Sequence, residues 1–201
     1  HTDNRRQRQM CIRDSLLAGM FNSVGGHNST VANTVGGHDL TDHWDKINTS
    51  GNSWNTSLRN SGHIWDYVVI QDQSQIPGFS RTNQDWISSK NSAVAISDAV
   101  DDENSEVMLM MTWGYRSGDS TNLMIYSNYT NMQDKLELGY LDYHDNMTSP
   151  SKDVWIAPVG LGFKNVYYSV IADGDNPTFP GNTFYDLYNN DGSHPSLSGS
   201  Y

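Results

Sequence analysis

The chain has 201 residues and a formal net charge of −11, from 12 Lys and Arg against 23 Asp and Glu. This length fits one domain with a substantial hydrophobic core. The acidic balance disfavours partners such as nucleic acids and anionic membranes, because phosphate groups attract cationic side chains. The sequence contains no apolar run as long as a membrane span.

The first fifteen residues need a separate interpretation. The run from Arg5 to Ser15 agrees codon by codon with the translation of a sequencing-library adapter. We interpret residues 1–15 as derived from the adapter, with the natural chain beginning near Leu16. Without them, 8 basic and 21 acidic side chains remain, a formal charge of −13. No cysteine remains either, which excludes disulfides and a cysteine nucleophile.

Residues 16–201 are expected to form one domain that is truncated at both ends, since Tyr201 falls where a helix is expected to begin. The chain is rich in Asn, Ser, Thr, Asp and Tyr and poor in Lys, a composition typical of exported proteins. We therefore predict a secreted or periplasmic protein whose signal peptide would lie upstream of the fragment.

Short apolar runs alternate with longer amphipathic segments along residues 16–201. In chain order, the pattern predicts a helix over 16–23, strands over 30–33 and 67–70, a helix over 83–100, a strand over 107–111, a helix over 126–143 and a strand over 154–157. This alternation indicates an α/β domain with a mostly parallel sheet and right-handed crossovers. In such sheets the ligand site lies at the carboxyl ends of the strands.

Each predicted strand is followed by a polar or glycine-rich turn. The four turns are Thr34 to Asp39, Gln71 to Gln75, Thr112 to Arg116, and Pro158 to Gly160. A further turn-forming run near the C-terminus contains Asp191 and His194, three residues apart. A histidine with a carboxylate that orients it can act as a general base, although a DxxH turn is more often a solvated loop.

This order of blocks resembles the SGNH (GDSL-type) hydrolase family, over about Leu16 to Tyr201. The resemblance implies a three-layer α/β/α sandwich with a mostly parallel, flavodoxin-like sheet. It also implies that Asp191 and His194 are catalytic and that Gly37 donates its N–H to an oxyanion hole, with Gly36 the next choice.

Two features depart from the family pattern. Gln73 stands where the family has an oxyanion-hole Asn, so its amide is either a donor placed one methylene further out or a structural loop residue. The first strand and its G-x-S turn are missing or replaced, because the adapter stands in their place. Ser15 imitates the family serine, but no apolar strand precedes it. We therefore expect the nucleophile to be absent and the fragment to be inactive.

Two further residues are candidates for the pocket. His38 follows the glycine turn, and Trp113 follows a strand end, where it either stacks on a sugar or acyl group or packs in the core. The histidines and acids between His38 and His43 are too few for a metal site, and we interpret them as the start of a helix. We expect neither a metal nor another cofactor.

The predicted function is that of a serine ester hydrolase acting on a polar or carbohydrate ester. Its partner would be a small-molecule or glycan ester, with no nucleic acid and no membrane. One alternative is a non-catalytic carbohydrate-binding or interaction domain on the same fold. Another is a flavodoxin-like domain for a small ligand, which leaves Asp191 and His194 unexplained.

Overall fold

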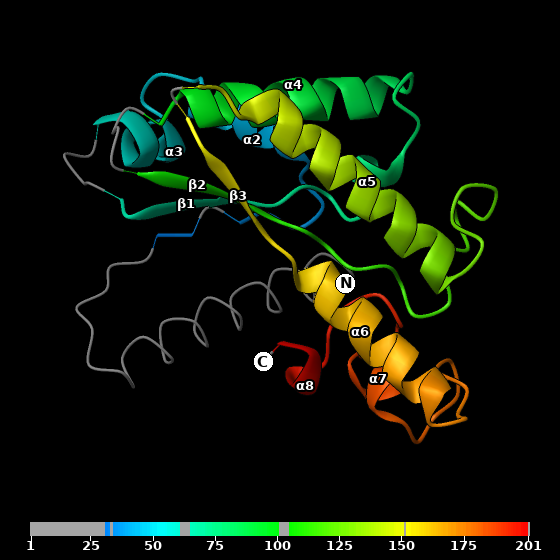
Figure 1. Cartoon of the computed structure of the whole chain (residues 1–201). Coiled ribbons are helices and arrows are strands. Elements are labelled where there is room, and N and C mark those ends of the chain that lie inside the picture. Colours follow the sequence, from blue (N-terminus) through cyan, green and yellow to red (C-terminus); the bar gives the residue numbers. More distant parts are fainter. Residues whose placement is uncertain (1–30, 33, 61–64, 101–104, 151, 201) are drawn as a thin grey trace, which may run out of the picture.

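The computed structural model describes residues 31–32, 34–60, 65–100, 105–150 and 152–200. A parallel sheet of three strands in the order β1-β2-β3 lies at its centre (Figure 1). The strands are β1 (Tyr67–Ile70), β2 (Glu106–Met110) and β3 (Val154–Ala157). They confirm three of the four predicted strands and the predicted α/β class with a parallel sheet.

One long helix precedes β1, and one follows each of the three strands. They are α2 (Leu40–Ile47), α4 (Gln84–Asp98), α5 (Tyr129–Met147) and α6 (Val159–Ala172). The short elements are α3 (Ser53–Asn55), the π-helix η1 (Thr56–Asn60), the 3-10 helix η2 (Ile76–Gly78), α7 (Thr183–Asp186) and α8 (Leu197–Ser200). Across the described ranges, no helix is both long and apolar enough to cross a membrane.

Two predicted helices are confirmed with shifted ends. The helix predicted over 83–100 is α4, and the Asn83 side chain caps it by accepting from the Asp85 N–H at 2.7 Å. The helix predicted over 126–143 is α5, which continues through Gly139 to Met147. Gly139 is needed for packing, because a Cβ there would clash with the carbonyl oxygen of Pro77.

Two other expectations were wrong. The turn expected at Pro158 to Gly160 does not form, because β3 ends at Ala157 and α6 begins at Val159. The strand predicted over 30–33 is not found at Val31 and Ala32, which are exposed and belong to no strand. Without burial, an apolar run this short has nothing to hold it in a sheet. The rest of that run, the helix predicted over 16–23, and Ser15 lie outside the described residues.

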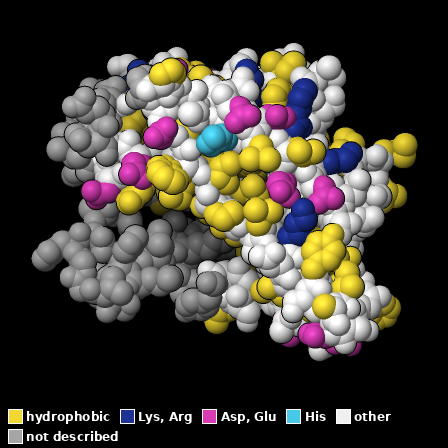
Figure 2. All heavy atoms as spheres, in the orientation of Figure 1, with side chains coloured by type: hydrophobic (Ala, Val, Ile, Leu, Met, Phe, Trp, Pro, Cys, Tyr) yellow, Lys and Arg dark blue, Asp and Glu magenta, His cyan; other side chains and the backbone are white. Residues whose placement is uncertain are grey.

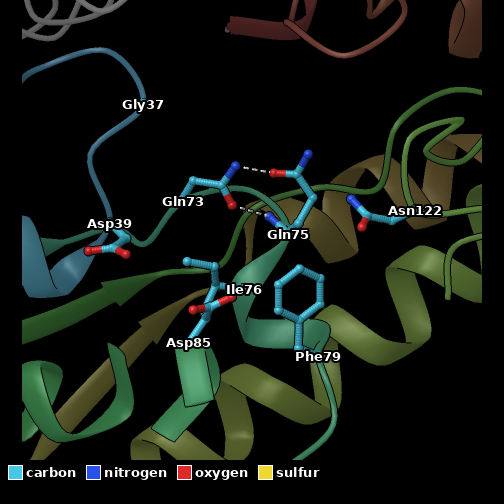
Figure 3. Close-up of a pocket in the computed structure, with 8 residues that line it drawn as sticks. All are labelled: Gly37, Asp39, Gln73, Gln75, Ile76, Phe79, Asp85 and Asn122. Carbon is cyan, nitrogen blue, oxygen red and sulfur yellow. Dashed lines mark hydrogen bonds between the residues drawn. The ribbon is translucent and has the colours of Figure 1, made fainter. Parts of the chain in front are cut away.

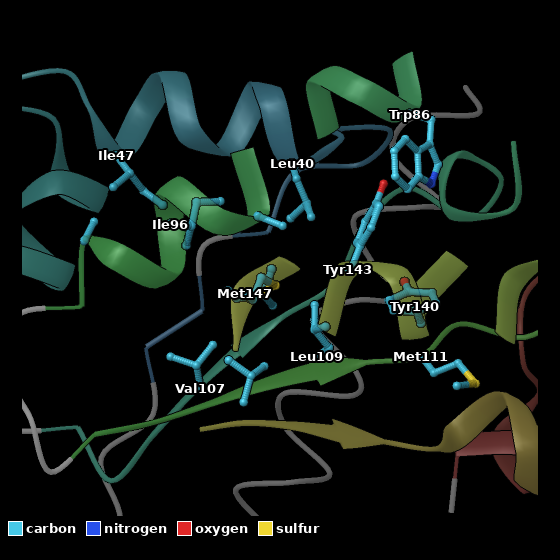
Figure 4. Packing of buried hydrophobic residues seen from close by; sticks show 14 residues of the cluster. Leu40, Ile47, Trp86, Ile96, Val107, Leu109, Met111, Tyr140, Tyr143 and Met147 are labelled. Carbon is cyan, nitrogen blue, oxygen red and sulfur yellow. The ribbon is translucent and has the colours of Figure 1, made fainter. Parts of the chain in front are cut away.

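The core lies between one face of the sheet and the helices α2, α4 and α5 (Figures 1 and 4). Side chains alternate along each strand, so Val107 and Leu109 are buried against Tyr143 and Ile96 from the helices. On the opposite face Tyr67, Val69 and Trp155 are each more than half exposed. Helices α2, α4 and α5 thus cover one face, and the third layer of the sandwich stays a prediction.

Candidate active site

The segments that follow the strands meet at the carboxyl end of the sheet. The segment after β2 contacts the segment after β1, where Gln75 Nε2 donates to Asp119 Oδ2 at 3.2 Å. The same segment holds the C-terminal loop, because the Arg116 N–H donates to the Gly192 carbonyl at 2.8 Å. The predicted sheet edge therefore gathers parts of the chain that are far apart in sequence.

Asp191 and His194 form a hydrogen-bonded pair in this C-terminal loop. The Nδ1 atom of His194 lies 2.8 Å from Asp191 Oδ2, while Asp191 Oδ1 accepts from the backbone N–H groups of Ser193 and His194, both at 2.9 Å. Partial burial would raise the pKa of Asp191, but these N–H groups and the imidazole hold that pKa below its usual value. The carboxylate is therefore ionised beside the imidazole at neutral pH.

The pair leaves the second ring nitrogen of His194 in the position that proton transfer requires. Among the described residues, the hydrogen bonds of this ring all use Nδ1, whose partners are the Asp191 carboxylate and Ser193 Oγ, the latter at 3.2 Å. An aspartate on Nδ1 fixes the tautomer that presents Nε2 to a reacting group. Ser193 contacts the opposite nitrogen, so His194 cannot activate its hydroxyl in this arrangement.

Trp113 packs against the C-terminal loop that contains Asp191 and His194. Its Nε1 donates to the Ser193 carbonyl at 2.9 Å, and its ring stacks on Phe163 with centroids 5.2 Å apart. The side chain is 7% exposed and lies in an aromatic cluster with Tyr129 and Tyr188. Trp113 therefore packs in the core and positions the loop, and it does not line the pocket as one interpretation of the sequence suggested.

A pocket of about 400 Å³ opens next to the segment after β1 (Figure 3). The residues that line it are Gly37, Asp39, Gln73, Gln75, Ile76, Phe79, Asp85 and Asn122. Gly37 and Gln73 thus lie in the same pocket, and their role as oxyanion donors stays a prediction. Gly36 and His38 do not line it.

The Asp191–His194 pair and the pocket are two distinct parts of this edge. Neither Asp191 nor His194 is among the residues that line the pocket. The segment after β2 connects the two parts, because it bonds to Gly192 at one end and to Gln75 at the other. The pocket is therefore a candidate for holding part of a substrate rather than its reacting atoms.

The side-chain amide of Gln73 is already partly engaged. Its Nε2 donates to the Gln75 side chain, and its Oε1 accepts from the Gln75 N–H at 2.8 Å (Figure 3). A primary amide has two N–H donors, so one remains for a substrate oxygen. The position of this amide is thereby fixed, which suits a preorganised donor as well as a structural loop.

The residues between His38 and His43 begin a helix, as the sequence indicated. Asp39 caps α2 by accepting from the Asp42 N–H at 2.9 Å, and the Asp42 side chain reaches back to the Asp39 N–H. His43 stacks on Trp54, and burial, together with the nearby His38, lowers its pKa to about 4. In the part of the chain that is described, no three metal-binding side chains come together.

Sequence reasoning missed Asp72, which precedes Gln73. This carboxylate is 1% exposed and accepts hydrogen bonds from Leu40, Gln73, Ser89 and Tyr143. Burial raises its pKa to about 6, against the lowering effect of these bonds. The available signal was an acid placed two residues after the apolar run 67–70, where a buried charge without partners is costly.

The fold is that of two solved structures, although no family model and no curated protein matches the chain. A protein from Slackia heliotrinireducens, provisionally assigned as an SGNH hydrolase, is 22% identical with a TM-score of 0.58 over 82% of this chain and 74% of that one. A DUF4886 family protein from Bacteroides uniformis is 20% identical with a TM-score of 0.61 over 83% of this chain and 64% of that one. The chain thus has an SGNH-like α/β hydrolase fold.

Proposed function

We propose that this chain carries the base and the substrate pocket of a serine ester hydrolase of the SGNH type. The observation that carries the proposal is the Asp191–His194 pair, which presents Nε2 at the carboxyl edge of a parallel sheet. The likeness to an SGNH hydrolase structure supports it at the level of the fold. The geometry favours a hydrolase over a flavodoxin-like domain, which would have no use for such a pair.

In the proposed reaction, His194 Nε2 takes the proton of a serine hydroxyl as the serine oxygen bonds to the ester carbonyl carbon. The oxyanion that forms accepts hydrogen bonds from Gly37 N–H and from the Gln73 amide. When the C–O bond to the leaving alcohol breaks, His194 returns the proton to that alcohol, and water then hydrolyses the acyl-serine by the same steps. No serine of the described residues is hydrogen-bonded to Nε2, so the nucleophile is left unassigned.

The lining of the pocket supports an uncharged polar ester as the substrate. Gln73, Gln75 and Asn122 offer amide groups, while Ile76 and Phe79 give an apolar side (Figure 3). A wall that combines amides with an apolar surface suits a sugar or a similar polar group. On the face shown in Figure 2, acidic and basic side chains are scattered among hydrophobic ones.

The negative charge of the pocket should favour uncharged esters over anionic ones. The eight lining residues include the carboxylates of Asp39 and Asp85 and no Lys or Arg. An ester with its own carboxylate would be repelled by these two side chains. We expect p-nitrophenyl acetate to be hydrolysed faster than p-nitrophenyl hemisuccinate, and replacing Asp39 or Asp85 by Asn to narrow the difference. A preference for the anionic ester would contradict the proposed substrate class.

The test of the function uses an extended protein, in which a strand and a G-x-S turn of the SGNH pattern are joined ahead of this chain. Turnover of p-nitrophenyl acetate should appear in the extended protein, and His194→Ala should remove all but a trace of it. His144→Ala is a matched control, because His144 Nδ1 lies 3.1 Å from Asp145 Oδ1 in a second His–Asp pair on α5. Equal losses in both variants, or strong activity in the 201-residue chain that Ser15→Ala removes, would contradict the proposal.

A non-catalytic carbohydrate-binding domain is the second candidate. The observation that favours it is that His194 does not line the pocket. Binding of N-acetylglucosamine that perturbs Gln73 and Asn122 in an extended protein without esterase activity would support this alternative.

A further inference from the structure

One carboxylate oxygen bonds to both sides of the pocket. Asp72 Oδ1 accepts from the Leu40 N–H at 3.2 Å and from the Gln73 N–H at 2.8 Å. Leu40 is the first residue of α2, and Gly37 precedes it by three residues. The wall that contains Gly37 and the wall that contains Gln73 are therefore joined through a single atom behind the pocket.

The other oxygen of Asp72 anchors this joint to the helices. Asp72 Oδ2 accepts from Ser89 Oγ of α4 at 2.7 Å and from the Tyr143 hydroxyl of α5 at 2.9 Å. With 1% of the residue exposed, water does not compete for these bonds. Three helices, α2, α4 and α5, and the neighbouring residue Gln73 thus converge on one carboxyl group.

We infer that Asp72 is a positioning residue, which holds the Gly37 wall and the Gln73 wall of the pocket at a fixed separation and relaxes that separation when it is protonated. A charged carboxylate accepts stronger hydrogen bonds from N–H groups than a neutral carboxyl does. The proton can reside on Oδ2, because hydroxyls such as those of Ser89 and Tyr143 can accept as well as donate. The bonds that weaken are then the two from the pocket walls to Oδ1.

The groups around Asp72 place its protonation near neutral pH. The titratable groups that act on it are Tyr140 and Tyr143 of α5, whose own pKa values are raised by burial, so both stay neutral. From α4 it meets the hydroxyl of Ser89, and from α2 a backbone N–H. Since burial raises the pKa of Asp72 to about 6, protonation occurs within the working range of many enzymes.

The test follows the backbone amide signals of Leu40 and Gln73 by NMR between pH 4.5 and 8. In the unaltered chain both signals should shift with one common midpoint near pH 6. Asp72→Asn keeps the shape and can still accept from both N–H groups, so it should fold and abolish the shared titration. Flat signals, separate midpoints, or an unchanged titration in Asp72→Asn would overturn the inference.

Two further variants test whether the titration midpoint depends on the hydrogen bonds of Asp72 or responds to any substitution. Ser89→Ala removes a bond to the charged carboxylate, so the midpoint should move to higher pH. Asp142→Asn breaks an ion pair with Arg81 on the surface and should leave the midpoint unchanged. Any consequence for catalysis rests on the proposed ester hydrolase, but the amide titration requires no turnover, so either idea can fail without the other.

Discussion

Asp72 and Asp191 are two carboxylates at the same end of the sheet, each bonded to two backbone N–H groups, yet their pKa values move in opposite directions. For both, burial is the largest effect and acts to raise the pKa. Asp72 is 1% exposed as a residue, and burial prevails there. The Asp191 side chain is 49% exposed, and its N–H groups together with His194 prevail. The degree of burial therefore decides the sign.

The difference indicates separate functions for the two acids. All four partners of Asp72 belong to the folded framework, so its bonds stabilise the arrangement of β1, α2, α4 and α5. Asp191 stays ionised beside an imidazole that is itself 31% exposed, as a group that orients a base requires. Changes at Asp72 should thus affect stability most, and changes at Asp191 should affect turnover most.

The largest expected effect is on the turnover of the extended protein carrying Asp191→Asn. An amide on Nδ1 favours the wrong tautomer of His194, which in comparable triads lowers kcat by about 10⁴-fold. The free energy of unfolding should change little, because the side chain is half exposed. Steady-state kinetics and urea denaturation check both values, with Asp145→Asn as the control pair. A loss below tenfold would remove Asp191 from the mechanism.

Asp72→Ala should have the largest effect on stability. It leaves two backbone N–H groups and two hydroxyls without their acceptor in a buried site. Each such group costs about 1–3 kcal/mol, less where it finds a new partner, so we expect a loss of at least about 3 kcal/mol in the free energy of unfolding. Asp191→Ala should cost about 1 kcal/mol or less, since water replaces the lost bonds. If urea denaturation gave similar losses of unfolding free energy for Asp72→Ala and Asp191→Ala, the two carboxylates would not differ in their contribution to stability.

The pH dependence of stability sharpens the same contrast. The folded pKa of Asp72, about 6, lies above its usual 3.8, so the folded state binds more protons between these values. Its contribution to stability is fully present below pH 3.8 and is lost as the pH rises through 6. The loss is on the order of 3 kcal/mol at 1.36 kcal/mol per pKa unit.

Comparison with Asp72→Asn isolates this contribution, because the amide does not titrate. The difference in unfolding free energy between the two proteins should change between pH 4 and pH 7, and it should be constant above that range. Asp191→Asn should give the opposite sign, since a lowered pKa stabilises above the unfolded value and that gain is lost as the pH falls. If the stability difference changed with pH in the same direction for both variants, the pKa values of Asp72 and Asp191 would not be shifted in opposite directions.

The parallel sheet and the pairing of Asp191 with His194 were predictable from local patterns. The strand at 67–70 was identified from its apolar run, and Asp191 and His194 from a spacing of three residues in a turn. Such signals are contained in a few neighbouring residues. The start of α2 was equally local, because a capping box formed by Asp39 and Asp42 is readable in sequence.

The contacts that position the site could not be predicted, because they join distant parts of the chain. Asp72 meets Leu40, Ser89 and Tyr143 at separations of 32, 17 and 71 residues. Trp113 reaches Ser193 across 80 residues, so its burial in the core could not be told from a place in the pocket. A residue's own neighbours in sequence do not encode such partners.

The smallest expected effect tests the Gly37 wall without altering either carboxylate. Gly37 has a φ of +84°, a backbone conformation that costs a residue with a Cβ about 1–2 kcal/mol. Gly37→Ala should therefore lower the free energy of unfolding by roughly that amount. Gly36, the neighbouring glycine, is not among the residues with positive φ, so Gly36→Ala should be close to neutral. If Asp72 holds this wall through Leu40, the strain in Gly37→Ala should also shift the Leu40 amide signal, while Gly36→Ala leaves it in place. Equal costs for the two variants in urea denaturation would show that the turn at Gly37 does not depend on its backbone conformation.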